Sequence, residues 1–489
     1  MGIHFFDVVE ESYPDVMAIS KDLNLKVVAR GMVGEAHGDV PDIMEILTKP
    51  LRTVEGIEKR LQVVMDCCYH SDITMRLREI LTDTLNKLNN HIKAIQDCRG
   101  KHLTDQTMIG TNLEAVRALT SGLADLDALL LRKKDVFETT ALKRFFRDFY
   151  EEISHERIIE QKFLIDNLDG FKNKGEILLR THIGEGFRMK NTEILDVREK
   201  AHKVQSGLFS GMRNDVIADE ETYQSSVEFT NRILLDILER CFPYLQHWQE
   251  LLSDMKKQAL FLAGCARLYN RREELGQIFC VPDREETKIF MLYELSLALQ
   301  THSNPVPNSL SVSSYRAIVV TGANQGGKST FLRSMGIAQV MCQAGMFVPA
   351  AKYPLRAYQN IFTHFTRRED ATMNMGKFEE ELNRMMGILE KAGAGTLILL
   401  NESFATTTEV TAYQIAMDLM HACLEEQVAL WMVTHITKFA RELYQEGRED
   451  VLFLSAGREA EREQKYEMIE KEPGNTSYGL DLYRQIIGE

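Results

Sequence analysis

The sequence predicts an α plus α/β protein, in which a mainly helical region is followed by an α/β domain that contains a P-loop. Apolar residues recur at helical spacing across much of the chain before residue 286. Beyond that point short apolar strands appear at 317–320 and 397–400, each followed by a glycine-rich or polar turn. The length of 489 residues exceeds what a single core supports, so we expect more than one domain.

These patterns divide the chain into three parts. Residues 1–45 show little periodicity, and the sequence assigns them no role. Residues 46–285 are predicted to form the helical region, and residues 286–489 the α/β domain.

Three apolar stripes indicate helices within the helical region. They comprise Ile57, Leu61, Val64 and Cys68; Leu77, Leu81, Leu85, Leu88 and Ile92; and Val116, Leu119, Leu123, Leu126 and Leu130. We interpret them as buried helix faces and not as cofactor sites. After Pro243 a pattern with alternating spacings of three and four residues predicts one long helix packed lengthwise against a partner. It comprises Leu245, Trp248, Leu252, Met255, Ala259, Leu262, Ala266 and Tyr269.

The interval 169–215 departs from the helical pattern, with glycines and strand-like pieces such as 177–183. It carries nine Lys and Arg residues against seven Asp and Glu. The interval is therefore our candidate for contact with a nucleic-acid phosphate backbone. A solvated irregular segment is the alternative interpretation.

Residues 322–329 fit the P-loop pattern G-x-x-x-x-G-K-[ST], after an apolar strand and before a helix-compatible segment at 331–342. The glycines allow consecutive backbone N–H groups to point at one anion, and the following helix adds the positive end of its dipole. Lys328 would then neutralise phosphate charge of ATP, and the Ser329 hydroxyl would ligate Mg²⁺. The predicted nucleotide-binding residues are Gly322, Ala323, Asn324, Gln325, Gly326, Gly327, Lys328, Ser329 and Thr330. A glycine-rich turn that only joins a strand to a helix is the alternative.

Charge and cysteine content narrow the possible functions. The chain has 58 Lys and Arg against 72 Asp and Glu, a formal net charge of −14. Residues 301–489 contain 18 Lys and Arg against 23 Asp and Glu, and residues 1–300 contain 40 against 49. Neither part is therefore a basic nucleic-acid-binding domain. Eight cysteines without a C-x-x-C pair indicate neither zinc ligands nor a disulfide framework, which favours a cytoplasmic setting. No targeting segment or membrane span is predicted.

The P-loop and its flanks resemble the MutS family of mismatch-repair ATPases, whose P-loop reads T-G-P-N-M-G-G-K-S-T. Ala323 stands at the family's proline, and Gln325 at its methionine. At 304–311, a family-like segment, Pro305 or a neighbour replaces an aromatic residue that often stacks on adenine. Other segments with the same resemblance lie at 50–64, 344–350, 360–363 and 475–480.

The resemblance also implies site residues outside the P-loop. The strand at 397–400 ends in Asn401-Glu402, where the family has Asp-Glu. Asn401 would hold Mg²⁺ with an uncharged oxygen, and Glu402 would activate the attacking water, so hydrolysis is expected to be slow. His435, beyond the next strand, stands at the family's γ-phosphate sensor.

Two segments depart from the family pattern. Gly376-Lys377 replaces a Ser-Thr pair that, in the family, caps the γ-phosphate bound by the partner subunit. Residues 406–409 replace a G-T-S-T run.

The resemblance implies a helical core and lever region at 46–285 and an ABC-type ATPase domain at 286–489, which forms a homodimer head to tail around two ATPs. It implies an enzyme that acts on DNA in mismatch repair or recombination, truncated so that the mismatch-recognition domain is absent. Two alternatives remain open. One is an ATP-gated dimerisation module that moves a protein partner without binding DNA, which the net charge favours. The other is an ATP-binding pseudo-enzyme, suggested by Asn401 and Gly376.

Overall fold

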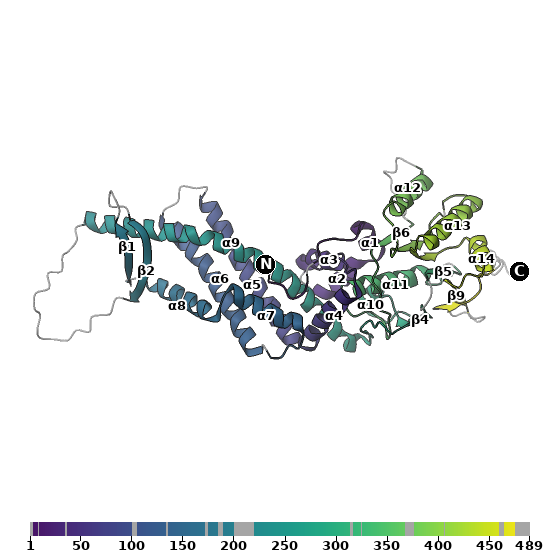
Figure 1. The fold of residues 1–489 in the computed structure, drawn as a ribbon, viewed down its shortest axis with the longest axis horizontal. Coiled ribbons are helices and arrows are strands. Elements are labelled where there is room, and N and C mark those ends of the chain that lie inside the picture. The colour runs from purple at the N-terminus through teal and green to yellow at the C-terminus, as the bar shows by residue number, and fades with distance from the viewer. Residues whose placement is uncertain are drawn as a thin grey trace, which may run out of the picture. The chain divides into compact units, whose positions relative to one another are not determined.

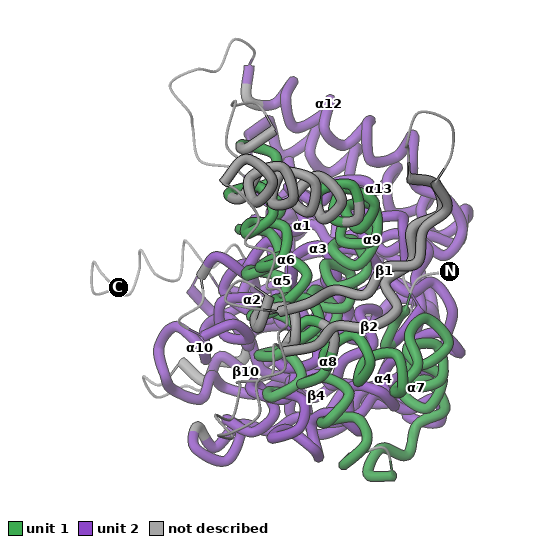
Figure 2. The backbone as a smooth tube through the Cα atoms, turned by 90° about the vertical axis from the view of Figure 1, so that its left-hand side faces the viewer, with its two compact units in different colours: residues 1–5, 75–259 green, residues 6–74, 260–489 purple. Residues whose placement is uncertain are grey.

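The computed structural model describes residues 3–7, 9–34, 37–99, 105–133, 135–171, 175–183, 189–199, 220–312, 316–323, 325–366, 376–404, 406–458 and 464–474. Over these residues the fold is α plus α/β, as predicted (Figure 1). Contacts divide the chain into two compact units (Figure 2): unit 1 comprises residues 1–5 and 75–259, and unit 2 comprises residues 6–74 and 260–489. In the described ranges, no helix combines the length and apolarity needed to cross a membrane.

Unit 1 is built from long helices and one β-hairpin. Its elements are most of α5 (Ser71–Arg99), α6 (Asp105–Lys133), α7 (Thr140–Glu152), α8 (His155–Phe171), β1 (Gly175–Ile183), β2 (Met189–Glu199) and the first part of α9 (Glu220–Leu275). The leucines predicted on α5 and α6 are buried, while Val116 is half-buried. The two stripes are thus helix faces that pack into a core, as expected.

An aromatic cluster fills the core of unit 1. Trp248 is fully buried and packs edge-on against Phe149, with ring centroids 6.4 Å apart. Phe5, close to the N-terminus, stacks on Phe145 at 4.0 Å, and its backbone N–H donates to Gln258 Oε1 at 2.8 Å. Burying these large rings provides much of the hydrophobic stabilisation of the unit.

The helix predicted after Pro243 is longer than the pattern indicated. α9 begins at Glu220 and contains Pro243. Leu238 and Phe242 before the proline are buried in the same way as Leu245 after it. Because proline removes one backbone hydrogen bond without interrupting this buried face, the helix continues through it.

The strand-like pieces predicted in 169–215 form an antiparallel hairpin of β1 and β2, with irregular register after Leu178 and after Arg180. Its side chains, and residues 200–215, lie outside what the structure describes. The contact with a phosphate backbone that we assigned to this interval stays a prediction.

Unit 2 contains a mixed sheet with helices on both faces. Its described strands run in the order β10-β9-β5-β8-β7-β6, and all neighbours are parallel except β9 and β10. The strands are β5 (Ala317–Thr321), β6 (Ile361–Phe365), β7 (Leu397–Asn401), β8 (Ala429–Val433), β9 (Val451–Arg458) and β10 (Gln464–Glu470), with β3 (Lys288–Leu292) and β4 (Asn308–Ser311) as a separate pair. The helices are α1 (Val16–Asp22), α2 (Leu25–Val33), the 3₁₀ turn η1 (His37–Asp39), α3 (Val40–Leu47), α4 (Val54–Tyr69), α10 (Leu295–Thr301), α11 (Lys328–Gln343), α12 (Lys377–Leu389), α13 (Glu409–Glu425) and α14 (Thr437–Gln445).

The alternation of side chains along β7 shows which helices cover each face. Ile398 and Leu400 belong to a buried cluster with residues of α12, α13 and α14. Leu399 points the other way, since a Cβ added to Gly336 of α11 would lie 2.8 Å from Leu399 Cδ1. The P-loop helix therefore lies on the face opposite α13 and α14.

Residues that the sequence left without a role pack onto the helix that follows the P-loop. In α11, Arg333 Nε donates to the backbone oxygen of Asp22 at 3.0 Å. A Cβ on Gly336 would approach Leu23 Cδ2 to 2.6 Å, so the glycine lets the α1–α2 turn come close. Asn24 Nδ2 donates to Ser296 Oγ of α10 at 3.4 Å. The described residues from Phe6 to residue 45 belong to unit 2.

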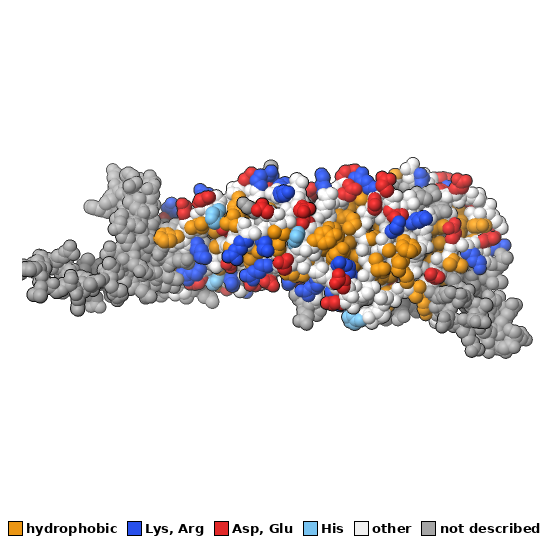
Figure 3. All heavy atoms as spheres, turned by 90° about the horizontal axis from the view of Figure 1, so that it is seen from below, with side chains coloured by type: hydrophobic (Ala, Val, Ile, Leu, Met, Phe, Trp, Pro, Cys, Tyr) orange, Lys and Arg blue, Asp and Glu red, His pale blue; other side chains and the backbone are white. Residues whose placement is uncertain are grey.

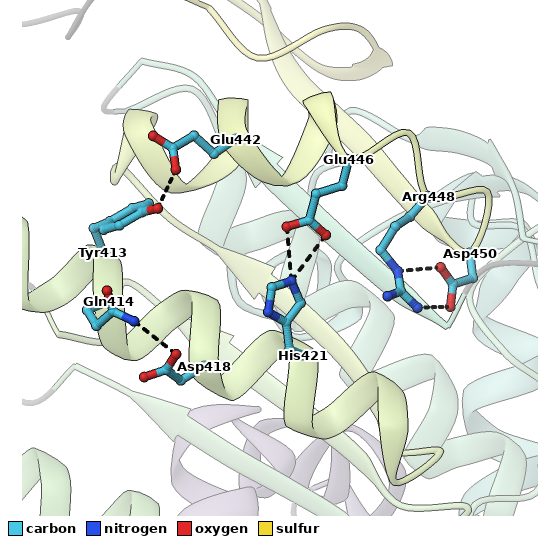
Figure 4. Close-up of polar contacts among 8 residues, drawn as sticks. All are labelled: Tyr413, Gln414, Asp418, His421, Glu442, Glu446, Arg448 and Asp450. Carbon is cyan, nitrogen blue, oxygen red and sulfur yellow. Dashed lines mark hydrogen bonds and ion pairs between the residues drawn. The ribbon is translucent and has the colours of Figure 1, made fainter.

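Polar contacts join α14 to α13 at the surface of unit 2 (Figure 4). His421 Nε2 of α13 lies 3.0 and 3.1 Å from the two carboxylate oxygens of Glu446, and Tyr413 donates its hydroxyl to Glu442. Lys438 lies 4.3 Å from the centre of the Tyr413 ring. These partly exposed contacts add modestly to the packing of α14, whose apolar face, including Phe439, lies in the core.

Candidate functional site

The turn between β5 and α11 depends on its glycines. Gly322 has φ of +119° and Gly327 has φ of +82°, values that residues with a Cβ rarely adopt. A Cβ on Gly322 would also lie 2.9 Å from the backbone nitrogen of Ala456 in β9. Gly327 is the N-cap of α11 and offers no side chain to its first N–H groups, which suits an anion there. Asn324 lies outside the described residues.

Lys328 is buried at the start of α11, with 4% of its surface exposed. Its Nζ donates to the backbone oxygens of Gly322 at 2.9 Å and Ala323 at 2.8 Å. Burial lowers the pKa of Lys328 below its usual value, and the nearby Glu402 carboxylate offsets part of this shift. The ammonium therefore lies inside the turn and next to an acidic side chain.

Ser329 brings the P-loop into contact with β7. Its Oγ donates to Asn401 Oδ1 at 2.8 Å, across 72 positions of sequence. A hydroxyl and an amide oxygen at this separation are hard oxygen ligands of the type that Mg²⁺ accepts, so the donor set fits that ion without supplying charge. Glu402 follows with φ of +54°, and its backbone N–H donates to Val433 O at 2.9 Å.

A cavity of about 460 Å³ lies over these residues. It is lined by Leu297, Asn304, Pro305, Val306, Asn308, Gln325, Gly326, Gly327, Lys328, Ser329, Thr330, Glu402 and Tyr466. The lining combines the cationic Lys328 and the acidic Glu402 with glycine, apolar and aromatic residues. Such a combination, beyond the carboxyl ends of parallel strands, fits a phosphate ester with an attached planar group.

Most predicted site residues converge, and some do not. Gly322 and Ala323 accept from Lys328, and Asn401 contacts Ser329, although none of these three appears in the cavity lining. His435 is exposed, two residues beyond β8, and lies outside the lining.

The segments that depart from the family pattern lie partly outside the described residues. Gly376 is the exposed N-cap of α12, and the side chain of Lys377 is not described. Thr406 donates to Glu381 Oε2 at 2.8 Å. Residues 475–480 lie outside the described residues.

Sequence reasoning missed Tyr466. Tyr466 lies in β10, where its backbone has φ of +48°, and its side chain lines the cavity. A short contact from Met468 N–H to Asn308 Oδ1, 2.6 Å long, joins β10 to β4, whose Asn308 also lines the cavity. The position depends on how an edge strand is paired, which no local pattern specifies. Pro305, by contrast, lies in the segment 304–311, which the sequence analysis linked to the adenine base of the nucleotide.

The fold and this site define an α plus α/β protein with a glycine-rich turn at the end of a parallel strand. Residues 318–487 match the family described as MutS domain V. The chain is 35% identical over 123 residues to the DNA mismatch repair protein MutS of Thermotoga petrophila, covering 25% of this chain and 16% of that protein. The match to MutS domain V assigns the α/β domain of the chain to the MutS family.

Two longer matches extend beyond the α/β domain. The DNA mismatch repair protein MutS of Petrotoga mobilis is 25% identical over 413 residues, covering 76% of this chain and 49% of that protein. The DNA mismatch repair protein Msh3 of Homo sapiens is 23% identical over 404 residues, covering 79% of this chain and 35% of that protein. The matched region thus spans half or less of each of these relatives.

Proposed function

We propose that this protein binds ATP with Mg²⁺ and hydrolyses it slowly. Binding of the nucleotide would close a head-to-tail homodimer, and this dimer would act on DNA. The protein would be located in the cytoplasm. The observation that carries the proposal is that Lys328, Ser329 and Glu402 line one cavity, while Asn401 accepts a hydrogen bond from Ser329. Bound ATP would supply the phosphoanhydride bond that is cleaved. The relatives named as DNA mismatch repair proteins support the DNA part of the proposal.

Each residue has a distinct part in this proposal. Lys328 would transfer its hydrogen bonds from the turn carbonyls to phosphate oxygens, and Ser329 with Asn401 would hold Mg²⁺. Glu402 would orient and deprotonate the attacking water. Tyr466 and Pro305 would contact the base. His435 would sense the γ-phosphate only after a movement that brings it to the cavity.

Nucleotide binding is tested by comparing the wild-type chain with Lys328→Ala. Removing a charged donor to phosphate costs roughly 1.5–3 kcal/mol, so we expect the Kd for ATP to rise about tenfold or more. Far-UV circular dichroism and thermal melting provide the control, because the variant should keep its helices. Equal ATP affinity in the two proteins would rule out the assignment of the P-loop.

The alternative, a nucleotide-gated module acting on a protein partner, is favoured by the net charge of −14. On the face drawn in Figure 3, Lys and Arg side chains are interspersed with Asp and Glu in the described part of the surface. Binding to duplex and branched DNA at several salt concentrations, with and without ATP, separates the two functions. DNA binding that weakens steeply with salt supports the first function, and its absence under all conditions supports the second.

A further inference from the structure

The loop after β7 holds two residues in an unusual backbone conformation. Glu402 has φ of +54° and Phe404 has φ of +68°, and neither is glycine. Residues with a Cβ adopt this region uncommonly, and the conformation persists where surrounding groups hold it. Something outside the loop must therefore hold Glu402 in place.

Thr366, directly after β6, supplies one set of contacts. Its Oγ1 donates to the backbone oxygens of Glu402 at 2.8 Å and Asn401 at 3.0 Å. Its backbone N–H also donates to Asn401 O, at 3.2 Å. Together with the bond from Glu402 N–H to Val433 O, these contacts fix the peptide groups on both sides of Glu402.

His364 in β6 supplies a second set of contacts to the same loop. Its Nδ1 lies 2.7 Å from Ser403 Oγ, and that hydroxyl donates to His364 O at 3.2 Å. The Phe404 ring is fully buried and lies at 26° to the imidazole plane of His364, with centroids 6.4 Å apart. The end of β6 thus contacts every residue from Asn401 to Phe404.

We propose that Thr366 is a positioning residue, whose hydroxyl keeps the Glu402 carboxylate directed at the cavity. Glu402 lines the cavity and Thr366 does not, so Thr366 acts through Glu402. Without the hydroxyl, the Glu402 carbonyl loses its donor, and the residue can relax to a negative φ that turns its side chain away. The inference rests on the proposed role of Glu402 in ATP hydrolysis.

The test compares Thr366→Val, which replaces the hydroxyl with a methyl group, with Thr366→Ser, which retains it. We expect Thr366→Val to lower kcat about tenfold, as the loss of one hydrogen bond to the loop predicts, with the Kd for ATP within about twofold of wild type. Thr366→Ser should retain most of the wild-type kcat. Thr363→Val is the matched control, because Thr363 is buried in β6, three residues before Thr366, and its hydroxyl has no hydrogen-bond partner within the described residues.

Two results would overturn the positioning role. One is a wild-type kcat in Thr366→Val, and the other is a parallel loss of ATP affinity, which would indicate a general structural role. A crystal structure of Thr366→Val gives a readout that needs no activity: a negative φ at Glu402 supports the inference, and a retained positive φ overturns it. If the wild-type chain binds ATP but does not hydrolyse it, the proposed ATPase function fails, and this crystal structure still decides the role of Thr366.

Discussion

Asn401 stands where a carboxylate would give Mg²⁺ a charged ligand. Its Oδ1 accepts a hydrogen bond from Ser329 Oγ at 2.8 Å, and an aspartate could accept the same bond. If the missing charge limits metal binding, Asn401→Asp should lower the Mg²⁺ concentration required and raise turnover several-fold. The added charge-assisted contact is worth on the order of 1–3 kcal/mol. Steady-state ATPase assays over a Mg²⁺ titration test this.

A fall in turnover of Asn401→Asp would contradict this prediction. It would mean that the loop from Ser403 onward has adapted to an uncharged residue. Asn401→Ala is the control, because it removes the oxygen ligand and should raise the Mg²⁺ concentration required above that of wild type.

Glu294 gives a pH dependence. It is buried at the N-cap of α10, and burial raises the pKa of its carboxyl, an effect partly offset by hydrogen bonds from Ser296 Oγ and Leu297 N–H. A carboxyl with a raised pKa in the folded state binds more protons than in the unfolded state. Its contribution to stability is therefore complete below the unfolded pKa and is lost as pH rises through the folded pKa.

Chemical denaturation at several pH values tests Glu294→Gln. The free energy of unfolding of the variant, relative to wild type, should increase as pH rises from about 4 toward neutrality. Any constant offset from the changed N-cap does not affect this trend. A difference that does not vary with pH would contradict it.

The four residues that carry the proposed chemistry could be predicted because each lies in a local pattern. Lys328 and Ser329 follow a glycine-rich turn, and Asn401 and Glu402 end an apolar strand. Tyr466 and Thr366 could not be predicted in this way, since they reach the site through the pairing of β10 with β9 and of β6 with β7. Strand pairing of this kind joins positions that are distant in sequence.

At the scale of elements, α11 is held from several directions. Leu51 N–H donates to Gln343 O at 2.7 Å, and Gln343 Nε2 returns a bond to Leu51 O at 3.2 Å. Arg333, at the middle of the helix, donates to Asp22 O. The helix that begins with Lys328 is thus fixed by segments more than 290 residues earlier in the chain, as the Leu51 contact illustrates.

Helical stripes were predictable and helix limits were not. The stripe of α4 is buried at Ile57, Leu61 and Val64, as its periodicity indicated. α1 and α2 contain only 7 and 9 residues, too few to produce a clear period. Their burial comes from contacts with α10 and α11, which a local pattern does not reveal.

The close approach of α5 and α6 gives a prediction at this scale. A Cβ on Gly122 of α6 would lie 2.1 Å from Thr84 Oγ1 and 2.6 Å from Thr84 Cβ. Thr84 is buried and donates to Ile80 O, so it cannot move away easily. Gly122→Ala should therefore lower the free energy of unfolding by about 1–3 kcal/mol.

Gly110→Ala is the matched control on the same helix. Nothing lies within 4 Å of a Cβ at Gly110. In this open position alanine should stabilise the protein by roughly 0.5–1 kcal/mol through its higher helix propensity. If the two substitutions changed the free energy of unfolding equally in denaturant experiments, Gly122 would not be needed for the close approach of α5 and α6.

At the scale of the whole molecule, we expect nucleotide bound in the cavity to control dimer formation. Glu402 lies on the same cavity as Lys328, and its carboxylate would face the negative charge of bound phosphate. Glu402→Gln removes this repulsion together with the group that would activate water. We therefore expect hydrolysis to fall below detection while ATP binds at least as tightly as to wild type.

Under the proposed closure, Glu402→Gln should accumulate as an ATP-bound dimer, because chemistry no longer reopens the assembly. Sedimentation velocity with ATP and Mg²⁺ measures this directly. The double variant Lys328→Ala/Glu402→Gln should remain monomeric, since it lacks the phosphate-binding cation. Glu426→Gln, which neutralises the C-cap residue of α13, should behave as wild type. A monomer of Glu402→Gln at every ATP concentration would refute nucleotide-driven dimer closure, while leaving nucleotide binding to be judged by the Lys328→Ala comparison.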